Sequence, residues 1–600
     1  MKKLLVYLKD YKKESVLAPL FKMLEALFEL FVPLVMQQII DVGIANRDKG
    51  YIVRMCLVMV VLGVIGLTCS LTAQFFSAKA AVGFATKLRH ALFAHIQRLG
   101  YTELDTVGTS TMITRMTSDI NQLQSGVNMV LRLFMRSPFI VFGAMIMAFT
   151  INVKAALIFV VTIPLLSLVV FGIMMITIPM FKRVQAALDR VLGKTRENLT
   201  GVRVIRAFAK EEEEISEFDK SNVLLTYRQI RVGKISALTN PLTNVIVNLA
   251  IAVLLWVGAI QVDIGIITQG AVVALVNYMS QILVELVKLA NLIVTITKAV
   301  ACAGRIEKVF DMTPEMQDGD AAAFAELTHV QSQKRKGAVV KGAMRQRHSD
   351  YAVEFRGVGL TYKNAGAESL DQLNFKIKHG ETVGIIGGTG SGKSSVINLI
   401  PRYYDATEGE VLVDGINVKD YPMEVLRDKV GMVMQKAVLF KGTIRENLQW
   451  GKKDATEKEM YRALDIAQAR EFVDKKEGGL DEPITQGGKN LSGGQRQRLT
   501  IARALVKQPE ILVLDDSASA LDFATDARLR KALREMDASM TVFIVSQRAA
   551  SIMHADQIIV LDDGKIVGIG KHEELLRACE VYQEIYYSQF PEKAGKVVTE

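Results

Sequence analysis

Apolar residues gather into six long runs in the first half of the chain. These runs cover residues 16–44, 51–80, 132–151, 153–180, 240–262 and 269–302. Each run approaches or exceeds the roughly 20 residues that an α-helix needs to cross about 30 Å of hydrocarbon. We therefore expect six transmembrane helices. The even number places both ends of this region on the same side of the membrane.

Two of the connections between these runs are long and basic. They cover residues 81–131 and 181–239, whereas the connection at 263–268 contains no Lys or Arg. Positive charge concentrates on the cytoplasmic side of membrane proteins. We therefore expect both long connections and both termini to be cytoplasmic.

The long connections also carry a helical pattern. Apolar residues recur at helical spacing through 82–99 and 185–208, as they do along one face of an α-helix. The membrane helices are thus expected to continue into the cytoplasm. Short turn segments near 101–109 and 201–212 would form the tips.

The last apolar run contains three polar residues at helical spacing. Gln281, Glu285 and Lys288 share one face, and an ionisable group at membrane depth is a candidate functional site. The alternative is an intrahelical Glu285–Lys288 pair without a role in substrate binding. The sequence leaves both interpretations open.

Composition supports a membrane protein. Half of the residues are hydrophobic and the formal net charge is +10, an excess more typical of loops near anionic lipid than of nucleic-acid binding. The four cysteines are scattered, so a zinc or disulfide framework is not expected. Residues 1–13 mix five lysines with apolar side chains, which favours an amphipathic segment at the membrane interface over a signal peptide.

A different pattern begins after the sixth run. Residues 313–350 form an expected linker whose stretch 331–348 is basic. A solvated tether is the favoured interpretation, with binding to anionic lipid as the alternative. From Tyr351 onward, strand-like and helix-like stretches alternate, which indicates an α/β nucleotide-binding fold.

A glycine-rich stretch follows a predicted strand at 381–386 and precedes a predicted helix. It fits the pattern G-x-x-x-x-G-K-[ST], in which backbone N–H groups surround phosphates, the lysine reaches the β- and γ-phosphates, and the hydroxyl ligates Mg²⁺. The candidate nucleotide-binding residues here are Gly387, Gly388, Thr389, Gly390, Ser391, Gly392, Lys393, Ser394 and Ser395.

Two further motifs follow in order. Asp515 ends the apolar run 511–514, as expected of a buried strand that delivers a carboxylate to Mg²⁺. The stretch 491–495 reads Leu-Ser-Gly-Gly-Gln, and with it the chain resembles the ATP-binding cassette (ABC) transporters. The resemblance covers essentially the whole chain and is closest to exporter half-transporters, in which a six-helix membrane domain precedes one nucleotide-binding domain.

The resemblance implies a domain plan and several roles. The plan is a transmembrane domain at 1–312, the linker at 313–350, a nucleotide-binding domain at 351–588 and a polar tail at 589–600. By resemblance, Tyr362 stacks on adenine, Gln435 contacts Mg²⁺ or its water, and the tips are coupling helices. The resemblance also implies that Ser519–Asp522 forms the D-loop.

In this family, ATP is buried between two nucleotide-binding domains arranged head to tail. The signature residues face the γ-phosphate that the other domain's phosphate loop holds. Here these residues are Ser492, Gly493, Gly494 and Gln495. A chain with one such domain therefore needs a partner, and ATP and Mg²⁺ are the expected cofactors.

Two positions depart from the family pattern. Asp516 stands where a glutamate usually orients the attacking water, and Gln547 replaces the switch histidine. Aspartate withdraws the carboxylate by about 1 Å, and such a misplacement can cost on the order of 10²-fold in rate. Glutamine hydrogen-bonds but carries no charge. Both losses fall on the same ATP site, whereas the signature and the D-loop are intact.

This division resembles one partner of the heterodimeric ABC exporters. The resulting hypothesis is ATP-driven export of amphipathic drugs or lipids across the plasma membrane. The chain would give Ser394, Gln435 and Asp515 to the metal of a degenerate site and lend its signature to a competent one. The alternatives are a slowly hydrolysing homodimer and a non-hydrolytic ATP-gated regulator. Importers are disfavoured because they usually carry the two domains on separate chains.

Overall fold

The computed structural model describes residues 3–320, 322, 324, 349–363, 365–536 and 539–594. The chain divides into two compact units. The first consists of Met1–Arg98 with Thr109–Met312, and the second of Leu99–Gly108 with Thr313–Glu600. The expected basic stretch at 331–348 lies outside the described residues.

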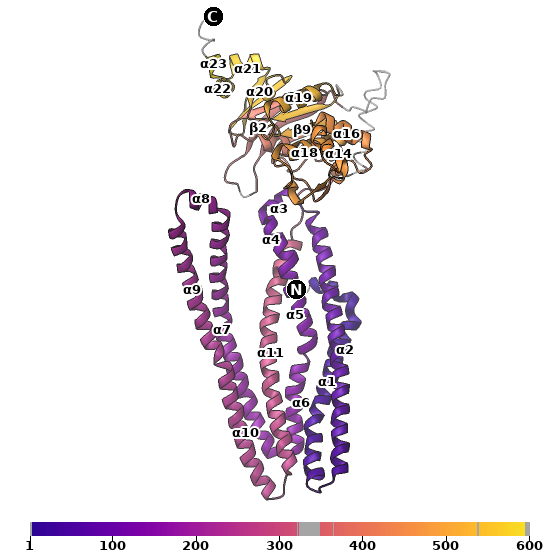
Figure 1. Cartoon of the computed structure of the whole chain (residues 1–600), viewed down its shortest axis with the longest axis vertical. Coiled ribbons are helices and arrows are strands. Elements are labelled where there is room, and N and C mark those ends of the chain that lie inside the picture. Colours follow the sequence, from indigo (N-terminus) through magenta and orange to yellow (C-terminus); the bar gives the residue numbers. More distant parts are fainter. Residues whose placement is uncertain are drawn as a thin grey trace. The chain divides into compact units, whose positions relative to one another are not determined.

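The first unit is helical and is drawn from indigo to magenta in Figure 1. Six helical stretches in it are long and apolar enough to cross a membrane, which confirms the expected six spans. They are Leu4–Ile44, Lys49–Ile96, Thr109–Ile151, Val153–Thr200, Glu211–Asp263 and Gln269–Phe310.

These stretches contain shorter elements. The first is a 3₁₀ helix at Leu4–Tyr11, then α1 (Lys12–Gln38) and a π-helix at Ile39–Ile44, and the second is α2 (Lys49–Ile96). The third contains α4 (Thr109–Thr114), a π-helix at Arg115–Asp119, α5 (Ile120–Leu133) and α6 (Arg136–Ile151). The remaining helices are α7 (Val153–Thr200), α8 (Val202–Ala207), α9 (Glu211–Ala237), α10 (Thr239–Asp263) and α11 (Gln269–Phe310).

Small side chains line the centre of this bundle. The buried core formed by α1, α6, α7, α10 and α11 is rich in alanine, which lets membrane helices approach closely. Tyr278 is fully buried in this core, and its hydroxyl donates to the Leu30 carbonyl at 2.6 Å. A buried tyrosine thus has the hydrogen-bond partner that its phenol requires.

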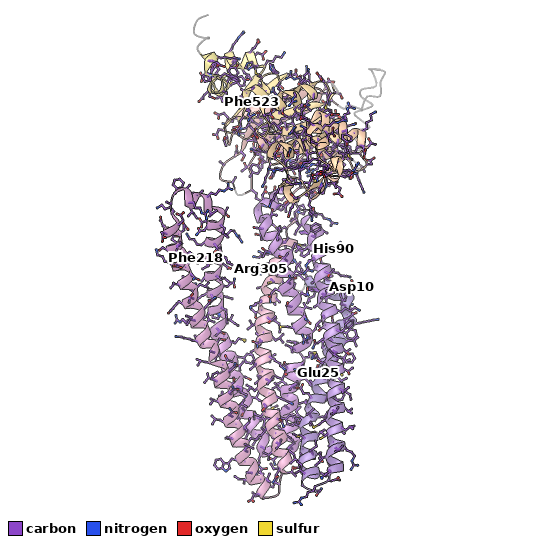
Figure 2. The ribbon with its side chains drawn as sticks, in the orientation of Figure 1. Asp10, Glu25, His90, Phe218, Arg305 and Phe523 are labelled. Carbon is purple, nitrogen blue, oxygen red and sulfur yellow. The ribbon has the colours of Figure 1, made fainter. Side chains whose placement is uncertain are left out.

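The helices α7 and α9 continue beyond the apolar runs as a long pair (Figure 1). Ala187 and Val191 of α7 pack against Leu225 of α9, with Phe218 alongside; Figure 2 labels Phe218 on this pair. The short helix α8 closes the pair and contains no buried residue. The helical continuation and the tip expected near 201–212 are therefore present in the structure.

The other tip, α3 (Tyr101–Val107), belongs to the second unit. Its Tyr101 ring lies 4.7 Å from the Tyr403 ring, centroid to centroid. The Tyr404 hydroxyl donates to the Asp105 carboxylate at 2.6 Å. Glu103 of the same helix accepts from the Glu315 backbone N–H at 3.0 Å.

The second unit is an α/β fold built on two larger sheets, as expected. A four-stranded antiparallel sheet has the order β2-β1-β4-β5, and a six-stranded sheet has the order β12-β11-β3-β10-β9-β6. The antiparallel strands are β1 (Tyr351–Leu360), β2 (Leu370–Lys378), β4 (Glu408–Val413) and β5 (Ile416–Asn417). The others are β3 (Thr382–Gly387), β6 (Val430–Val433), β9 (Ile511–Asp515), β10 (Thr541–Val545), β11 (Gln557–Asp562) and β12 (Lys565–Gly570). A short pair, β7 (Gly442–Thr443) with β8 (Pro483–Ile484), completes the strands of the described part.

Helices of this unit accompany the six-stranded sheet. They include α13 (Lys393–Leu399), α14 (Met423–Lys429), α15 (Ile444–Gln449), α16 (Glu457–Ile466), α17 (Arg470–Asp474) and α18 (Gly493–Val506). The C-terminal ones are α19 (Phe523–Arg534), α20 (Ala549–Ile552), α21 (His572–Ala578), α22 (Glu580–Gln589) and α23 (Pro591–Ala594).

The central strands of the six-stranded sheet are buried on both faces. In β10, Phe543 and Val545 join the core shared with the antiparallel sheet, whereas Val542 and Ile544 join the core shared with α16 and α18. Such central strands appear as continuous apolar runs in sequence. The carboxyl ends of these buried central strands position the candidate site.

The C-terminal segment differs from the expected frayed tail where the structure describes it. Gln589 is the last residue of α22. Its side chain accepts from the Ala549 N–H at 2.8 Å and donates to the Gln547 carbonyl at 2.7 Å. The Phe590 ring lies 4.8 Å from the Tyr586 ring. Packing of these aromatic and amide groups orders a stretch whose polar composition alone suggested disorder.

Candidate ATP site

Four segments of the predicted site follow four neighbouring parallel strands. The strands β3, β10, β9 and β6 are adjacent and parallel. The phosphate loop follows β3, Gln547 follows β10, Asp515 ends β9, and Gln435 comes shortly after β6. Ligands of open α/β sheets bind outside the carboxyl ends of their strands. The fold therefore brings these sequence-distant residues to one edge.

The phosphate loop is held in a conformation that needs glycine. Gly390 and Gly392 have φ of +88° and +92°, a region that L side chains rarely adopt. A Cβ on Gly387 would stand 2.1 Å from the Leu561 carbonyl oxygen, whereas nothing lies within 4 Å of a Cβ on Gly388 or Gly390. The loop is thus tight on the strand side and open on the other, as a phosphate cradle requires.

Lys393 begins the helix after this loop. Its ammonium donates to the Gly387 carbonyl at 3.0 Å, the Gly388 carbonyl at 2.5 Å and the Ser391 hydroxyl at 3.2 Å. Burial lowers the pKa of Lys393, and the nearby Asp516 and Asp515 oppose that shift. The ammonium is therefore held beside the open side of the loop.

Ser394 and Asp515 form the candidate metal pair. The Ser394 hydroxyl donates to Asp515 Oδ1 at 3.2 Å, and Asp515 is buried at the end of β9. Burial raises the pKa of the Asp515 carboxyl, and the hydrogen bond from Ser394 counteracts it. One hydroxyl and one carboxylate oxygen, with phosphate and water oxygens, suit Mg²⁺. These residues fit the implied ion, and the loop fits a nucleotide phosphate.

Asp516 has unusual backbone geometry for a non-glycine residue. Its φ is +43°, and its N–H donates to the Val545 carbonyl at 3.0 Å. Burial raises the pKa of its carboxyl, while hydrogen bonding from the Gln435 amide opposes the shift. Strained residues of this kind cluster at functional sites. The structure thus brings Asp516 and Gln435 together, and the Lys393 ammonium is close enough to Asp516 to oppose the same shift.

Gln547 and Tyr362 flank the site differently. Gln547 is exposed, and its backbone carbonyl accepts from Gln589. Tyr362 is half-buried, and its hydroxyl donates to the Ser395 hydroxyl at 2.9 Å. The Tyr362 ring is also edge-on to the Tyr404 ring, with centroids 5.0 Å apart. Tyr362 therefore stands beside the start of α13, where a base attached to the phosphates could be contacted.

The signature residues begin α18. Ser492 caps this helix by accepting from the Gln495 N–H at 3.2 Å, and the Gln495 side chain accepts from the Ser492 N–H at 2.9 Å. A capping box of this kind fixes a helix start. Ser492 and Gly493 are exposed, and within the described residues the side chains of Ser492 and Gln495 hydrogen-bond each other's backbone and not the phosphate loop. The signature therefore presents its donors to the surface.

The D-loop lies against the signature. A Cβ on Gly494 would approach the Ala520 carbonyl oxygen to 3.0 Å, so the two backbones pack closely. Ser519 donates to the Asp516 carbonyl at 2.7 Å, and Asp522 caps α19 by accepting from the Thr525 N–H at 2.8 Å. The D-loop thus connects Asp516 of this chain's own site with the exposed signature.

Arg548 is a contributor that the sequence did not single out. Its guanidinium lies 4.8 Å from the centre of the Phe523 ring, which Figure 2 labels. It also donates to the Ala518 and Leu521 carbonyls at 3.4 Å. Its position directly after Gln547 indicated that it lies near the site. Its contacts could not be predicted, because they depend on how β10 approaches the D-loop.

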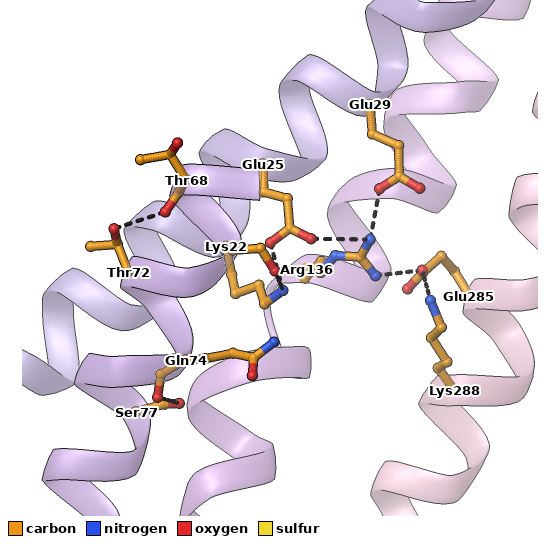
Figure 3. Close-up of polar contacts among 11 residues, drawn as sticks. Lys22, Glu25, Glu29, Thr68, Thr72, Gln74, Ser77, Arg136, Glu285 and Lys288 are labelled. Carbon is orange, nitrogen blue, oxygen red and sulfur yellow. Dashed lines mark hydrogen bonds and ion pairs between the residues drawn. The ribbon is translucent and has the colours of Figure 1, made fainter. Parts of the chain in front are cut away.

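The polar face of α11 proves to be part of a larger cluster. The expected Glu285–Lys288 pair is present at 2.8 Å. Glu285 also accepts from Arg136 Nη1 at 2.6 Å (Figure 3). It accepts from the Ser137 hydroxyl at 2.8 Å as well. A lone intrahelical pair is therefore an incomplete description. The other members of this cluster are ionisable residues within the first and third apolar runs, and that unusual position was the feature of the sequence that could have identified them.

The family models match both parts of the chain. Residues 15–286 match the ABC transporter transmembrane region, and residues 370–519 match the ABC transporter domain. An uncharacterized ABC transporter ATP-binding protein of Mycobacterium tuberculosis, MT1311, is 36% identical over 97% of each chain. The putative multidrug export ATP-binding/permease protein YgaD of Bacillus subtilis is 31% identical over 98% of this chain and 99% of its own.

A solved structure shares the fold. A bacterial Atm1-family ABC exporter with ATP bound superimposes with a TM-score of 0.78 at 21% identity, covering 96% of this chain and 99% of the other. Together with the matched regions, this likeness establishes the architecture. The chain belongs to the ABC transporter family, with an exporter-type transmembrane region fused ahead of its nucleotide-binding domain.

Proposed function

We propose that this chain is one half of a heterodimeric exporter that moves amphipathic drugs or lipids across the plasma membrane. Its own phosphate loop and Asp515 hold Mg-ATP at a site that hydrolyses slowly. Its signature completes a second, faster site on a different polypeptide. The relative named as a putative multidrug exporter supports the amphipathic substrate class.

The observation that carries the proposal is a contrast within the nucleotide-binding domain. At this chain's own site, the residue after Asp515 is Asp516 and the switch position is Gln547, so the general base is short and the switch is uncharged. The signature keeps the family residues from Ser492 to Gln495, and Ser492 and Gly493 are exposed. This chain's own ATP site is altered, but the signature that it contributes to the opposite site is intact. This combination is expected of a subunit whose partner supplies a complete catalytic site.

The residues of this chain divide the work. Lys393 and the loop N–H groups neutralise the phosphates, and Ser394 with Asp515 holds the Mg²⁺, which screens phosphate charge when bound. Gln435 hydrogen-bonds Asp516 and thereby positions the weak base. The N–H groups that open α18, with the Ser492 hydroxyl, offer an anion site at a helix start for the partner's nucleotide.

Closure of two nucleotide-binding domains around ATP would be transmitted to the membrane helices through the short tips α3 and α8. The aromatic and carboxylate contacts of α3 with Tyr403 and Tyr404 provide one route, since α3 directly follows α2 along the chain. The exposed α8 is free to dock on a partner. Such closure shifts a population between inward-open and outward-open states.

The experiment compares two variants in the complex co-purified with its native partner. Ser492→Ala should abolish most of the Mg-ATP hydrolysis, because the lent donor belongs to the competent site. Lys393→Ala should weaken nucleotide binding at the slow site and leave measurable turnover. Unchanged hydrolysis in Ser492→Ala would overturn the heterodimer model.

The alternatives give different outcomes in the same experiment. A homodimer contains two identical sites, so Lys393→Ala would abolish hydrolysis as completely as Ser492→Ala. A non-hydrolytic regulator would show ATP binding but no hydrolysis sensitive to either residue. The pair of variants therefore separates all three models.

A further inference from the structure

A neutral cluster of six ionisable side chains lies within the membrane helices (Figure 3). Arg136 is at its centre: Nη1 contacts Glu285 and Nη2 contacts Glu29, each at 2.6 Å. Lys22 pairs with Glu25 at 2.5 Å and donates to the Ser70 hydroxyl at 3.0 Å. With Lys288 on Glu285, three cations offset three carboxylates, and charges at such depth are usually functional.

Counted along α11, the cluster lies toward the cytoplasmic end of the membrane span. Glu285 is sixteen residues after Gln269, the first residue of α11, which corresponds to about 24 Å at 1.5 Å per residue. The hydrocarbon core is about 30 Å thick. The cluster therefore belongs to the half of the core that faces the cytoplasm. The nucleotide-binding machinery makes no use of it.

A cavity of about 360 Å³ opens beside the cluster between α1, α2, α6 and α11. Its volume is in the range of small-ligand sites. One side is aliphatic and methionine-rich, which suits an adaptable apolar ligand. The other side is polar and consists of Glu29, Asn277, Ser280, Gln281, Glu285 and Lys288.

The polar side includes a buried hydrogen-bond acceptor that has no donor. The Asn277 amide nitrogen already donates to the Val273 carbonyl at 3.1 Å, and the Ser280 hydroxyl donates to the Val276 carbonyl at 3.1 Å. The Ser280 hydroxyl oxygen and the Asn277 amide oxygen can still accept from a ligand, and the Asn277 amide keeps one further N–H group. Gln281 Oε1 is buried without a hydrogen-bond partner in the described part of the chain. A buried acceptor left unpaired is costly, so a donor-bearing ligand would relieve it.

The charged residues at the cavity also favour a ligand that donates hydrogen bonds. Glu29 is 40% exposed and its only ion-pair partner at hydrogen-bond distance is Arg136, which it shares with Glu285. Lys288 is the one cation that lines the cavity, and its side chain is 41% exposed. A cationic ligand can displace the flexible, partly exposed Lys288 from Glu285. The buried Arg136 stays in place between Glu29 and Glu285.

We propose that this cavity is a subsite for the cationic, hydrogen-bond-donating head of an amphipathic ligand, such as a primary ammonium or a guanidinium. The head would bind Glu29 and the Gln281 and Asn277 oxygens, and the apolar part would pack on the methionine-rich side. The inference rests on the proposed function in one respect, because it treats the ligand as an exported amphiphile. An anionic head would meet two carboxylates and is disfavoured.

The test uses the full chain in nanodiscs without ATP and measures equilibrium binding of tritiated dodecylamine, with empty nanodiscs as background. Unlabelled dodecylamine should displace the tracer, while dodecanoate and dodecanol should not. Glu29→Gln should weaken tracer binding about tenfold or more, because a charge-assisted hydrogen bond is lost. Gln281→Leu, which disturbs no ion pair, should weaken it several-fold.

The matched control is Glu14→Gln. Glu14 lies on the same helix as Glu29 and pairs with Lys79 at 2.9 Å, but it neither belongs to the cluster nor lines the cavity, so binding should stay within about twofold of the parent. Equal tracer affinity in the parent, Glu29→Gln and Gln281→Leu would overturn the subsite, as would displacement by dodecanoate. If Glu29→Gln does not fold, Gln281→Leu decides. Because no ATP is used, a failed Ser492 experiment would remove the exporter model without changing this result.

Discussion

The hydroxyl of Ser394 donates to Asp515 Oδ1 at 3.2 Å. This contact connects the helix after the phosphate loop with the end of β9, two segments that are far apart in sequence. It exists because β3 and β9 both pair with β10 in parallel. The two oxygens are therefore close enough to share one metal ion.

Loss of either oxygen should weaken the magnesium-dependent part of nucleotide binding. Ser394→Ala and Asp515→Asn are each expected to raise the Kd for Mg-ATP about tenfold or more, with little effect on binding measured in excess EDTA. Ser394→Thr keeps the hydroxyl and serves as the control. Fluorescent-nucleotide titration checks this, and an unchanged Kd in both variants would argue against the metal pair.

Restoring the family residues should accelerate this chain's own site. Asp516→Glu with Gln547→His is expected to raise hydrolysis by on the order of tenfold to a hundredfold, because the carboxylate advances by about 1 Å. The positive φ of Asp516 is adopted more readily by aspartate than by glutamate, so the expected gain is net of a backbone cost. Asp516→Asn with Gln547→His is the control.

Single-turnover hydrolysis with the partner's phosphate loop disabled isolates this site. No gain in the double variant, with nucleotide binding intact, would mean that features other than Asp516 and Gln547 limit hydrolysis.

The tip α3 should depend on the hydroxyl of Tyr404. Tyr404→Phe removes the 2.6 Å hydrogen bond to Asp105, with an expected cost of about 1 kcal/mol. Hydrogen exchange of residues 101–107 should then be roughly fivefold faster. Tyr403→Phe retains the ring contact with Tyr101 and should leave exchange unchanged. Equal exchange in both variants would show that the hydroxyl is dispensable.

Arg136 should be essential for the stability of the membrane unit. Arg136→Gln leaves Glu29 and Glu285 without their shared partner, and breaking a buried pair in this way costs about 3–5 kcal/mol. We expect a clearly lower Tm in nanodiscs. Lys288→Gln removes a partly exposed cation while Arg136 still pairs with Glu285, so it should cost less than about 1 kcal/mol. Similar Tm values for both variants would contradict the central position of Arg136.

Features that depend on residues close together in the sequence could be predicted, whereas contacts between distant segments could not. Apolar runs report burial in lipid or in a parallel sheet, so the six spans and the strand before the phosphate loop could be read directly. The phosphate loop and the signature could be read because short contiguous stretches carry their chemistry. Lys393 and Ser492 are examples.

Other features depend on pairing between distant segments. The sequence placed Glu285 with Lys288 because they share a helix face, but Arg136 reaches Glu285 from α6, and no local pattern encodes that crossing. The hydrogen bond between Tyr404 and Asp105 arises in the same way. Gln589 appeared to be in a tail because its two hydrogen bonds are made to a different helix start and strand end.

The most direct test of the central claim is Mg-ATP hydrolysis by this chain purified alone in nanodiscs, with ATP binding measured on the same sample. The account predicts saturable ATP binding with negligible turnover, because Asp516 and Gln547 make this chain's own site slow. Robust turnover by the lone chain, abolished by Lys393→Ala, would contradict it and establish a homodimer with two working sites.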